Sequence, residues 1–253
     1  MTERATRLFD ARSFDGRLFD GRVSALVRRE LAAYFQSPVA YVVGIVFLVT
    51  TASLFFSTFF LFDRAEMRAF FGLLPVLLAL LMPALAMRQI AEERRRGTWE
   101  VLATLPVGIT RILAAKFFAL WITGTVLLVP TLFFVASVNM LGNLDPGPVA
   151  GGYLGAVLLT GAYSAVGLFA SAVSRSETVA LVTGLVIALL LSVLEGFLVL
   201  LPAAIVPFVQ YLGTSYHFSG FTRGVVDSRS LVYFLSVIVV FLAIAHYRLT
   251  RER

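Results

Sequence analysis

The sequence predicts an all-α membrane protein with six transmembrane helices. Hydrophobic residues make up 59% of the 253 residues and the mean hydropathy is +0.89, whereas soluble domains are usually about 45–50% apolar. Crossing about 30 Å of hydrocarbon takes roughly 20 apolar residues. The segments that meet this length are residues 38–62, 70–87, 112–138, 150–173, 178–201 and 231–249. No polar stretch is long enough to fold alone, so residues 22–253 are expected to form one membrane domain.

The chain begins with two segments of different character. Residues 7–21 read RLFDARSFDGRLFDG, an approximate five-residue repeat in which Arg and Asp cancel. Because five residues match no helical or solenoid period, residues 1–21 are predicted to be a disordered or loosely membrane-apposed tail. Residues 22–36 are predicted to form an amphipathic helix that lies flat at the membrane interface. Its apolar face consists of Val23, Leu26, Val27, Leu31, Tyr34 and Phe35.

Basic residues orient the predicted bundle. An even number of spans places both termini on one side. If that side is the cytoplasm, 17 of the 21 basic residues lie inside and only Arg64, Arg68, Arg223 and Arg229 lie outside. Cytoplasmic segments carry the excess of Lys and Arg, so the N- and C-termini are expected to be cytoplasmic.

Two of the spans have distinctive compositions. The second, 70–87, is the shortest and contains Pro75 and Pro83, which predicts a kinked helix. The fourth, 150–173, has small residues at close spacing, which allow helices to approach one another. These are Gly151, Gly155, Gly161, Ala165, Gly167 and Ser171. The fourth span is therefore predicted to lie in the interior of the bundle.

A charged segment, AEERRRGTWEVLATLPVG, lies between the second and third spans at residues 91–108. The second span can continue as a helix through Arg96, with Glu92 and Glu93 placed to pair with Arg96. Gly97 interrupts this helix. Thr98 can then cap a short new helix that ends at Pro106 and Gly108. Thr110 is similarly predicted to cap the third span.

On that short helix the apolar side chains form a stripe, made up of Trp99, Leu102 and Ala103. The stripe indicates a protein partner, because it faces neither a span nor a soluble domain of this chain. An ordinary positive-inside anchor would explain the three arginines at 94–96. It would not explain a capped helix with acidic residues.

The segment AEERRRGTWEVLATLPVGITRILAAKF resembles the motif between the second and third spans of type-2 ABC exporter permeases. In that family the motif is the coupling helix that docks on the ATP-binding subunit. Two further segments, YHFSGFTRGVVDSRSLVYFLSV and RRELAAYFQSPVAYV, resemble the gliding-motility-associated branch. The similarity covers residues 22–253. The residues that match the coupling element by position are Glu92, Glu93, Gly97, Thr98, Glu100, Leu102 and Pro106, with Trp99 in the apolar stripe.

The resemblance implies an exporter subunit in the inner membrane of a prokaryote, which provides half of a translocation pathway. Its expected partners are a separate ATP-binding subunit, a second permease copy or a related permease, and membrane lipid; an auxiliary protein with an extracytoplasmic domain is a further candidate, and nucleic acid is not expected. A phosphate-binding loop requires a Gly-Lys-Ser or Gly-Lys-Thr core, but the single lysine, Lys116, follows Ala115. The chain is therefore not expected to be an enzyme or to bind a cofactor. ATP and Mg²⁺ would be bound by the partner.

Several other features are open to more than one interpretation. Glu195 interrupts the fifth span near its outer end, where it could line a pathway, meet a polar neighbour or reach the interface. Residues 202–215 are too short to span and contain prolines, which favours a re-entrant or interfacial hairpin. The aromatic residues around it suit a headgroup belt or a substrate exit. His217 and His246 lie on opposite sides, so they cannot share a metal.

Two other functions compete with an exporter subunit. The chain could be a membrane anchor that recruits a cytoplasmic ATPase without transporting anything. A secondary transporter is less favoured, because the six spans show no inverted repeat of broken helices. An intramembrane prenyl protease is rejected, because its motif of two Glu with a following Arg meets Gly97 at the Arg position. The apolar and small residues of the spans do not identify a transported substrate.

Overall fold

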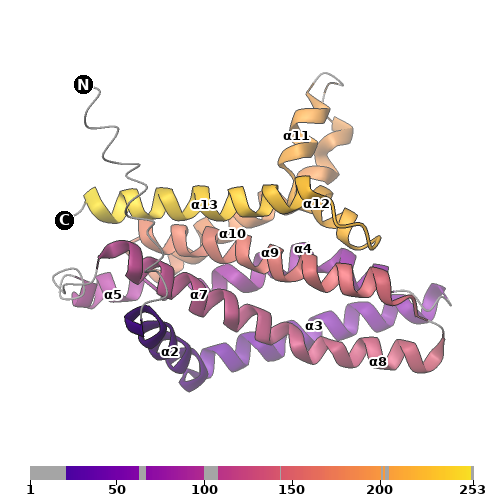
Figure 1. Cartoon of the computed structure of the whole chain (residues 1–253), viewed down its shortest axis with the longest axis horizontal. Helices are drawn as coiled ribbons and strands as arrows, with labels where there is room; N and C mark the ends of the chain where they lie inside the picture. The colour runs from indigo at the N-terminus through magenta and orange to yellow at the C-terminus, as the bar shows by residue number, and fades with distance from the viewer. Residues whose placement is uncertain are drawn as a thin grey trace.

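The computed structural model describes residues 21–62, 67–99, 108–142, 144–200, 202 and 205–251, and every regular element in these ranges is helical (Figure 1). The repeat at residues 7–20 lies outside them. The elements are α2 (Gly21–Gln36), α3 (Pro38–Phe62), α4 (Arg68–Ala86), α5 (Ala91–Arg95), α7 (Ile109–Leu128), the 3-10 helix η4 (Val129–Thr131), α8 (Leu132–Leu141), α9 (Pro146–Val173), α10 (Glu177–Val193), the 3-10 helix η5 (Leu194–Leu200), α11 (Val206–Leu212), α12 (Thr214–Phe221) and α13 (Ser228–Arg251).

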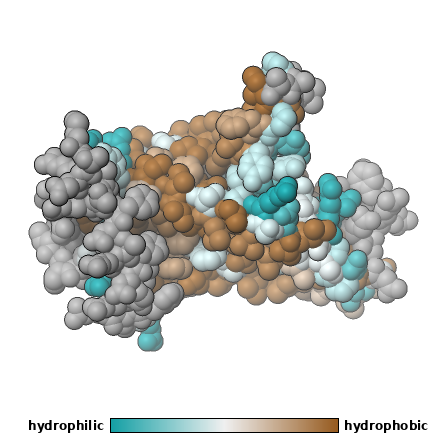
Figure 2. Space-filling model, turned by 45° about the horizontal axis from the view of Figure 1, so that its top comes forward, coloured by the Kyte–Doolittle hydropathy of each residue, from teal (hydrophilic) through white to brown (hydrophobic). Residues whose placement is uncertain are grey.

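Six helical stretches in the described ranges are long and apolar enough to cross a membrane, which confirms the predicted number of spans. They are Pro38–Ser57, Arg68–Arg95, Ile109–Leu141, Pro146–Val173, Glu177–Phe197 and Ser228–Arg251. Their long axes run along the length of the bundle (Figure 1). Hydrophobic side chains cover much of the bundle's visible side (Figure 2). Many of these side chains are exposed in the single chain, among them Val46, Phe133, Val182 and Val239, as expected for a surface that faces lipid.

Helix α9 is the interior helix of the bundle, as its small residues predicted. Its most apolar window is 78% buried, against 22% for that of α10, and it contacts α4, α7, α10, α12 and α13. A Cβ added at Gly151 would lie 2.5 Å from the backbone oxygen of Phe221, and one added at Gly167 would lie 2.6 Å from the Cβ of Ala86. Because such distances are too short for two atoms in contact, a larger residue at either position would force α9 away from its neighbours.

Three of the predicted spans differ from the structure in their continuity. The second does not continue as one helix through Arg96, because α4 ends at Ala86 and residues 87–90 form turns before α5. The third contains the 3-10 helix η4 at Pro130, a residue that has no N–H and whose ring crowds the preceding turn. The α-helical part of the fifth ends at Val193, and η5 follows. The two prolines of the second span, Pro75 and Pro83, both lie within helix α4.

The segment between the fifth and sixth spans contains two short helices. Helix α11 projects from the side of the bundle, whereas α12 packs on it (Figure 1). Phe218 and Phe221 are buried on α12, so these two rings do not belong to a headgroup belt. His217, also on α12, stacks on Tyr233 with 4.0 Å between the ring centroids, and burial lowers the pKa of its imidazole.

Single reporter insertions test the orientation of these helices. Insertions after Gly97 and Arg175 are expected to report the cytoplasm, and insertions after Asp145 and Gly224 the opposite side, because the basic residues are so unevenly distributed. The measurement is paired alkaline phosphatase and green fluorescent protein activity in cells. A cytoplasmic signal from Gly224 would contradict the six-span topology.

Candidate functional site

The described part of the charged segment, residues 91–99, lies at one end of the bundle, which we call the basic end. This end contains α2, α5, the start of α7 and the end of α13 (Figure 1). Thr110 Oγ1 lies 3.1 Å from His246 Nε2, which joins α7 to α13. The prediction that Thr110 caps the third span is therefore wrong: α7 begins at Ile109, follows Gly108 and has no side-chain cap.

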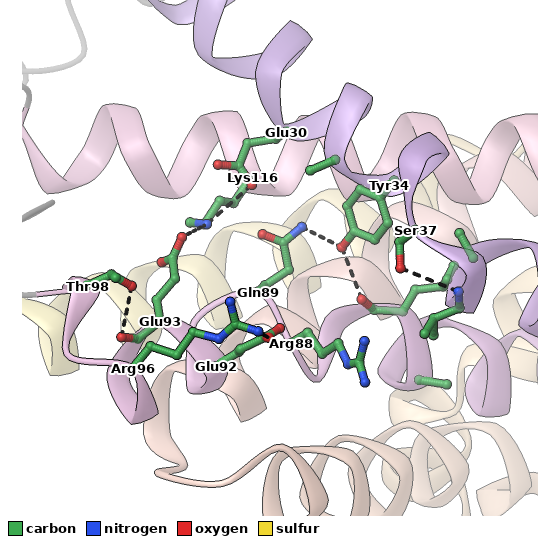
Figure 3. Close-up of a pocket in the computed structure, with 15 residues that line it drawn as sticks. Glu30, Tyr34, Ser37, Arg88, Gln89, Glu92, Glu93, Arg96, Thr98 and Lys116 are labelled. Carbon is green, nitrogen blue, oxygen red and sulfur yellow. Dashed lines mark hydrogen bonds and ion pairs between the residues drawn. The ribbon is translucent and has the colours of Figure 1, made fainter.

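Lys116 links three separate segments at the basic end. Its side chain is 2% exposed, and its Nζ donates to Glu93 Oε1 at 2.7 Å and to Glu30 Oε2 at 3.3 Å. Glu30 belongs to α2, Glu93 to α5 and Lys116 to α7, and Figure 3 shows the three side chains pointing toward one another. A buried ammonium group is stable only when carboxylates and hydrogen bonds replace water. We call these residues the Lys116 cluster.

This cluster was not predicted, because the ion pairs expected from the sequence lie within one helix. Glu92 does pair with Arg96, as predicted. Glu93, which was predicted to pair with Arg96 as well, pairs with Lys116 instead. A signal was present in the sequence: Lys116 continues the apolar stripe of Ile109, Ile112 and Leu113 at helical spacing, so it lies on the buried face of α7. A lone lysine on a buried face requires a partner from another helix.

A second polar contact attaches α2 to the end of α4. The Tyr34 hydroxyl donates to the backbone oxygen of Leu85 at 3.0 Å and accepts a hydrogen bond from Gln89 Nε2. Burial raises the pKa of the Tyr34 phenol, and the nearby Glu30 raises it further, so Tyr34 stays protonated and remains a donor. Together, Tyr34 and Glu30 hold α2 against the end of α4, the turn that follows it, and helix α7.

Glu177, in the first turn of α10, connects the same segment to a third helix. Its carboxylate accepts a hydrogen bond from Arg88 Nε at 3.1 Å and forms an ion pair with Arg95 at 2.7 Å. Both arginine side chains are about half exposed, so these pairs are individually weak. From α9, the Ser171 hydroxyl oxygen accepts the backbone N–H groups of Ile90 and Ala91. The segment 88–96 is therefore connected to α2, α7, α9 and α10.

The predicted coupling residues fall into two groups. Glu92, Glu93, Gly97, Thr98 and Trp99 are described and lie at the basic end, whereas Glu100, Leu102 and Pro106 lie outside the described residues.

In the described group, Gly97 has a φ of +71°, which agrees with its predicted role as the break after Arg96. The Thr98 hydroxyl donates to the backbone oxygen of Glu93 at 3.2 Å, at the end of α5. Trp99 is partly buried and packs against the hydrophobic core. The apolar stripe had suggested that Trp99 is available to a partner, but part of its side chain is covered by the chain itself.

Glu195 does not belong to this site. It is exposed at the start of η5. It follows Glu177 by 18 residues, which corresponds to about 27 Å along a helix. Its role in a pathway or polar contact stays a prediction. Among the residues that the structure describes, no three His, Cys, Asp or Glu side chains are grouped to hold a metal ion.

Most of the chain matches a known protein family. Residues 67–247 match the family model described as ABC-2 family transporter protein. The chain belongs to the ABC-2 transporter family. Members of this family are membrane components of ABC transporters, generally have no ATP site of their own and typically work with an ATP-binding subunit. No curated protein matches the chain. In this ABC-2 protein the matched residues include Glu93 and Lys116 but not α2.

Replacement of Lys116 by Met is expected to destabilise this ABC-2 protein. The substitution keeps most of the side-chain volume but leaves the Glu30 and Glu93 carboxylates without their shared cation. Breaking a fully buried pair costs about 3–5 kcal/mol, and the partial exposure of both carboxylates should reduce this loss. Thermal unfolding of the purified protein measures the change. Arg111→Gln, five residues earlier on α7, is the control, and an equal melting temperature for both variants would contradict the role of the cluster.

Proposed function

We propose that the chain is the permease subunit of an ATP-driven ABC exporter. It would form half of the translocation pathway and couple to a separate ATP-binding subunit. Membership in the ABC-2 family and the six apolar helices support this proposal. The observation that carries it is the set of contacts around residues 88–96. This segment resembles part of a coupling element by sequence, and it contacts four other helices.

These contacts suggest how motion would pass from the partner to the bundle. Closure of the ATP-binding subunits would displace the coupling segment. The Lys116 cluster would transmit this displacement to α2 and α7, and Glu177 would transmit it to α10. Glycine at position 97 would let the segment turn at its exposed end without straining α5. The permease halves would then change from an inward-open to an outward-open arrangement.

The proposal extends to the assembly as a whole. Two permease subunits, as a second copy or a related chain, would pair with two ATP-binding subunits that hold ATP and Mg²⁺. The assembly would lie in the inner membrane of a prokaryote, with both permease termini in the cytoplasm. The permease would belong to the gliding-motility-associated branch. An auxiliary protein with an extracytoplasmic domain could complete it.

Substitutions in the coupling segment should separate the fold from partner binding. Trp99→Ala removes part of a large aromatic side chain of the type that dominates interfaces, where truncation often costs about 2 kcal/mol, close to a thirtyfold loss of affinity. Glu100→Arg reverses a charge in the same segment. Both variants are expected to lose the ATP-binding subunit in pull-downs and to lose ATP-driven transport.

Arg175→Gln is the control, since Arg175 is exposed between α9 and α10 and a redundant set of positive charges tolerates one neutralisation. Membrane levels and size-exclusion profiles must match those of the parent, because Trp99 also packs on the core. Full retention of the partner by both Trp99→Ala and Glu100→Arg would refute the coupling role. ATPase activity of the reconstituted pair without transport of any tested compound would instead support the alternative of a recruiting anchor.

A further inference from the structure

A cavity opens between α2 and the α4–α5 turn at the basic end. Its volume is about 420 Å³, within the range of roughly 300–1,000 Å³ that is typical of small-molecule sites. One wall is charged or polar and the other is apolar. The polar wall includes Glu30, Arg88, Gln89, Glu93 and Arg96 (Figure 3). The apolar lining residues are Val39, Ala40, Ala84 and Leu85.

The polar wall has acceptor oxygens without donors. Gln89 is 7% exposed; its Nε2 donates to Tyr34, but its Oε1 has no hydrogen-bond partner among the described residues. The same is true of Glu93 Oε2, although Glu93 Oε1 accepts from Lys116. A buried acceptor without a donor is unfavourable. Both oxygens are closed to solvent, and the broad terminal torsions of Gln and Glu allow them to turn toward a donor in the cavity.

The rim of the cavity carries the opposite charge. Arg88 and Arg96 line the cavity and are 46% and 66% exposed. Arg88 pairs with Glu177, and Arg96 pairs with Glu92. Each guanidinium has further N–H donors for a second acceptor. A ligand that fits both regions has a cationic donor group at one end and an anion a short distance away.

The apolar wall indicates that this ligand is a membrane lipid. Val39 and Ala40 belong to the first turn of α3, where one span begins. Ala84 and Leu85 belong to the last turn of α4, where another span ends. Beyond them, Val42, Ile45 and Val46 of α3 are exposed hydrophobic side chains that can contact an acyl chain. Charged residues and lipid-facing residues therefore meet at this cavity.

We propose that the cavity binds the headgroup of an aminophospholipid such as phosphatidylethanolamine. The primary ammonium would donate to Glu93 and Gln89, and the phosphate would accept from Arg88 and Arg96. A phosphatidylcholine headgroup carries the same charges but has no N–H group to donate. The site therefore discriminates between headgroups by hydrogen bonding and not by net charge.

The test is a titration of the purified full-length chain, in detergent, with phosphatidylethanolamine or phosphatidylcholine of identical acyl chains. Native mass spectrometry measures the bound lipid. Phosphatidylethanolamine is expected to bind about tenfold more tightly, the difference expected when charge-assisted hydrogen bonds are lost. Equal binding of the two lipids would overturn the proposal.

Two neighbouring alanines on α2 provide matched variants. Both are exposed, but only Ala33 lines the cavity. Ala33→Leu is expected to abolish the preference for phosphatidylethanolamine by filling the cavity, and Ala32→Leu is expected to retain it. Ala84→Leu, on the apolar wall, provides a second filling variant from α4. Retention of the preference in both filling variants would also overturn the proposal.

Free phosphoethanolamine distinguishes a lipid from a soluble amine. It is expected to compete poorly, because it lacks the acyl chains that contact α3. Binding as tight as that of the whole lipid would overturn the assignment to a lipid. None of these measurements uses an ATP-binding subunit or transport, so their outcome is independent of the proposed exporter function.

Discussion

The ammonium group of Lys116 is the constraint on which the basic end depends. Its side chain is almost inaccessible to solvent, and among the described residues two carboxylates from separate segments replace its water. Since charge is costly to bury and costly to leave unpaired, α2 and α5 must both stay against α7. Helix α2 is thereby held to the bundle by a charged contact. The positions of Tyr34, Gln89 and the cavity beside them follow from this arrangement.

The predictions from sequence were accurate where composition alone decides. The six spans follow from length and hydropathy, and the interior position of α9 follows from glycines that leave no room for a Cβ. The break at Gly97 was also predictable, because glycine tolerates a positive φ. The turn at 87–90 was not, since it depends on Ser171 of α9, which accepts the backbone N–H groups of Ile90 and Ala91. A side chain 80 residues away leaves no signal in the local pattern.

The candidate site shows the same division. The sequence located the charged segment and correctly paired Glu92 with Arg96. It did not reveal that Glu93 pairs with Lys116 or that Glu177 collects two arginines, because these partners come from other helices. Basic residues from which only the orientation of the chain in the membrane was predicted therefore have a second role. They connect the segment between the second and third spans to the helices that it would have to move.

The burial of Lys116 also affects how the protein can be labelled. It is the chain's only lysine, so apart from the terminal amine it is the single target for reagents that acylate amines. In the structure its Nζ is enclosed by Glu30 and Glu93 and is closed to such reagents. The rate of acylation at this position therefore reports directly on how often α2, α5 and α7 separate. The protein thus carries a built-in chemical probe for opening of its basic end, without any engineered cysteine.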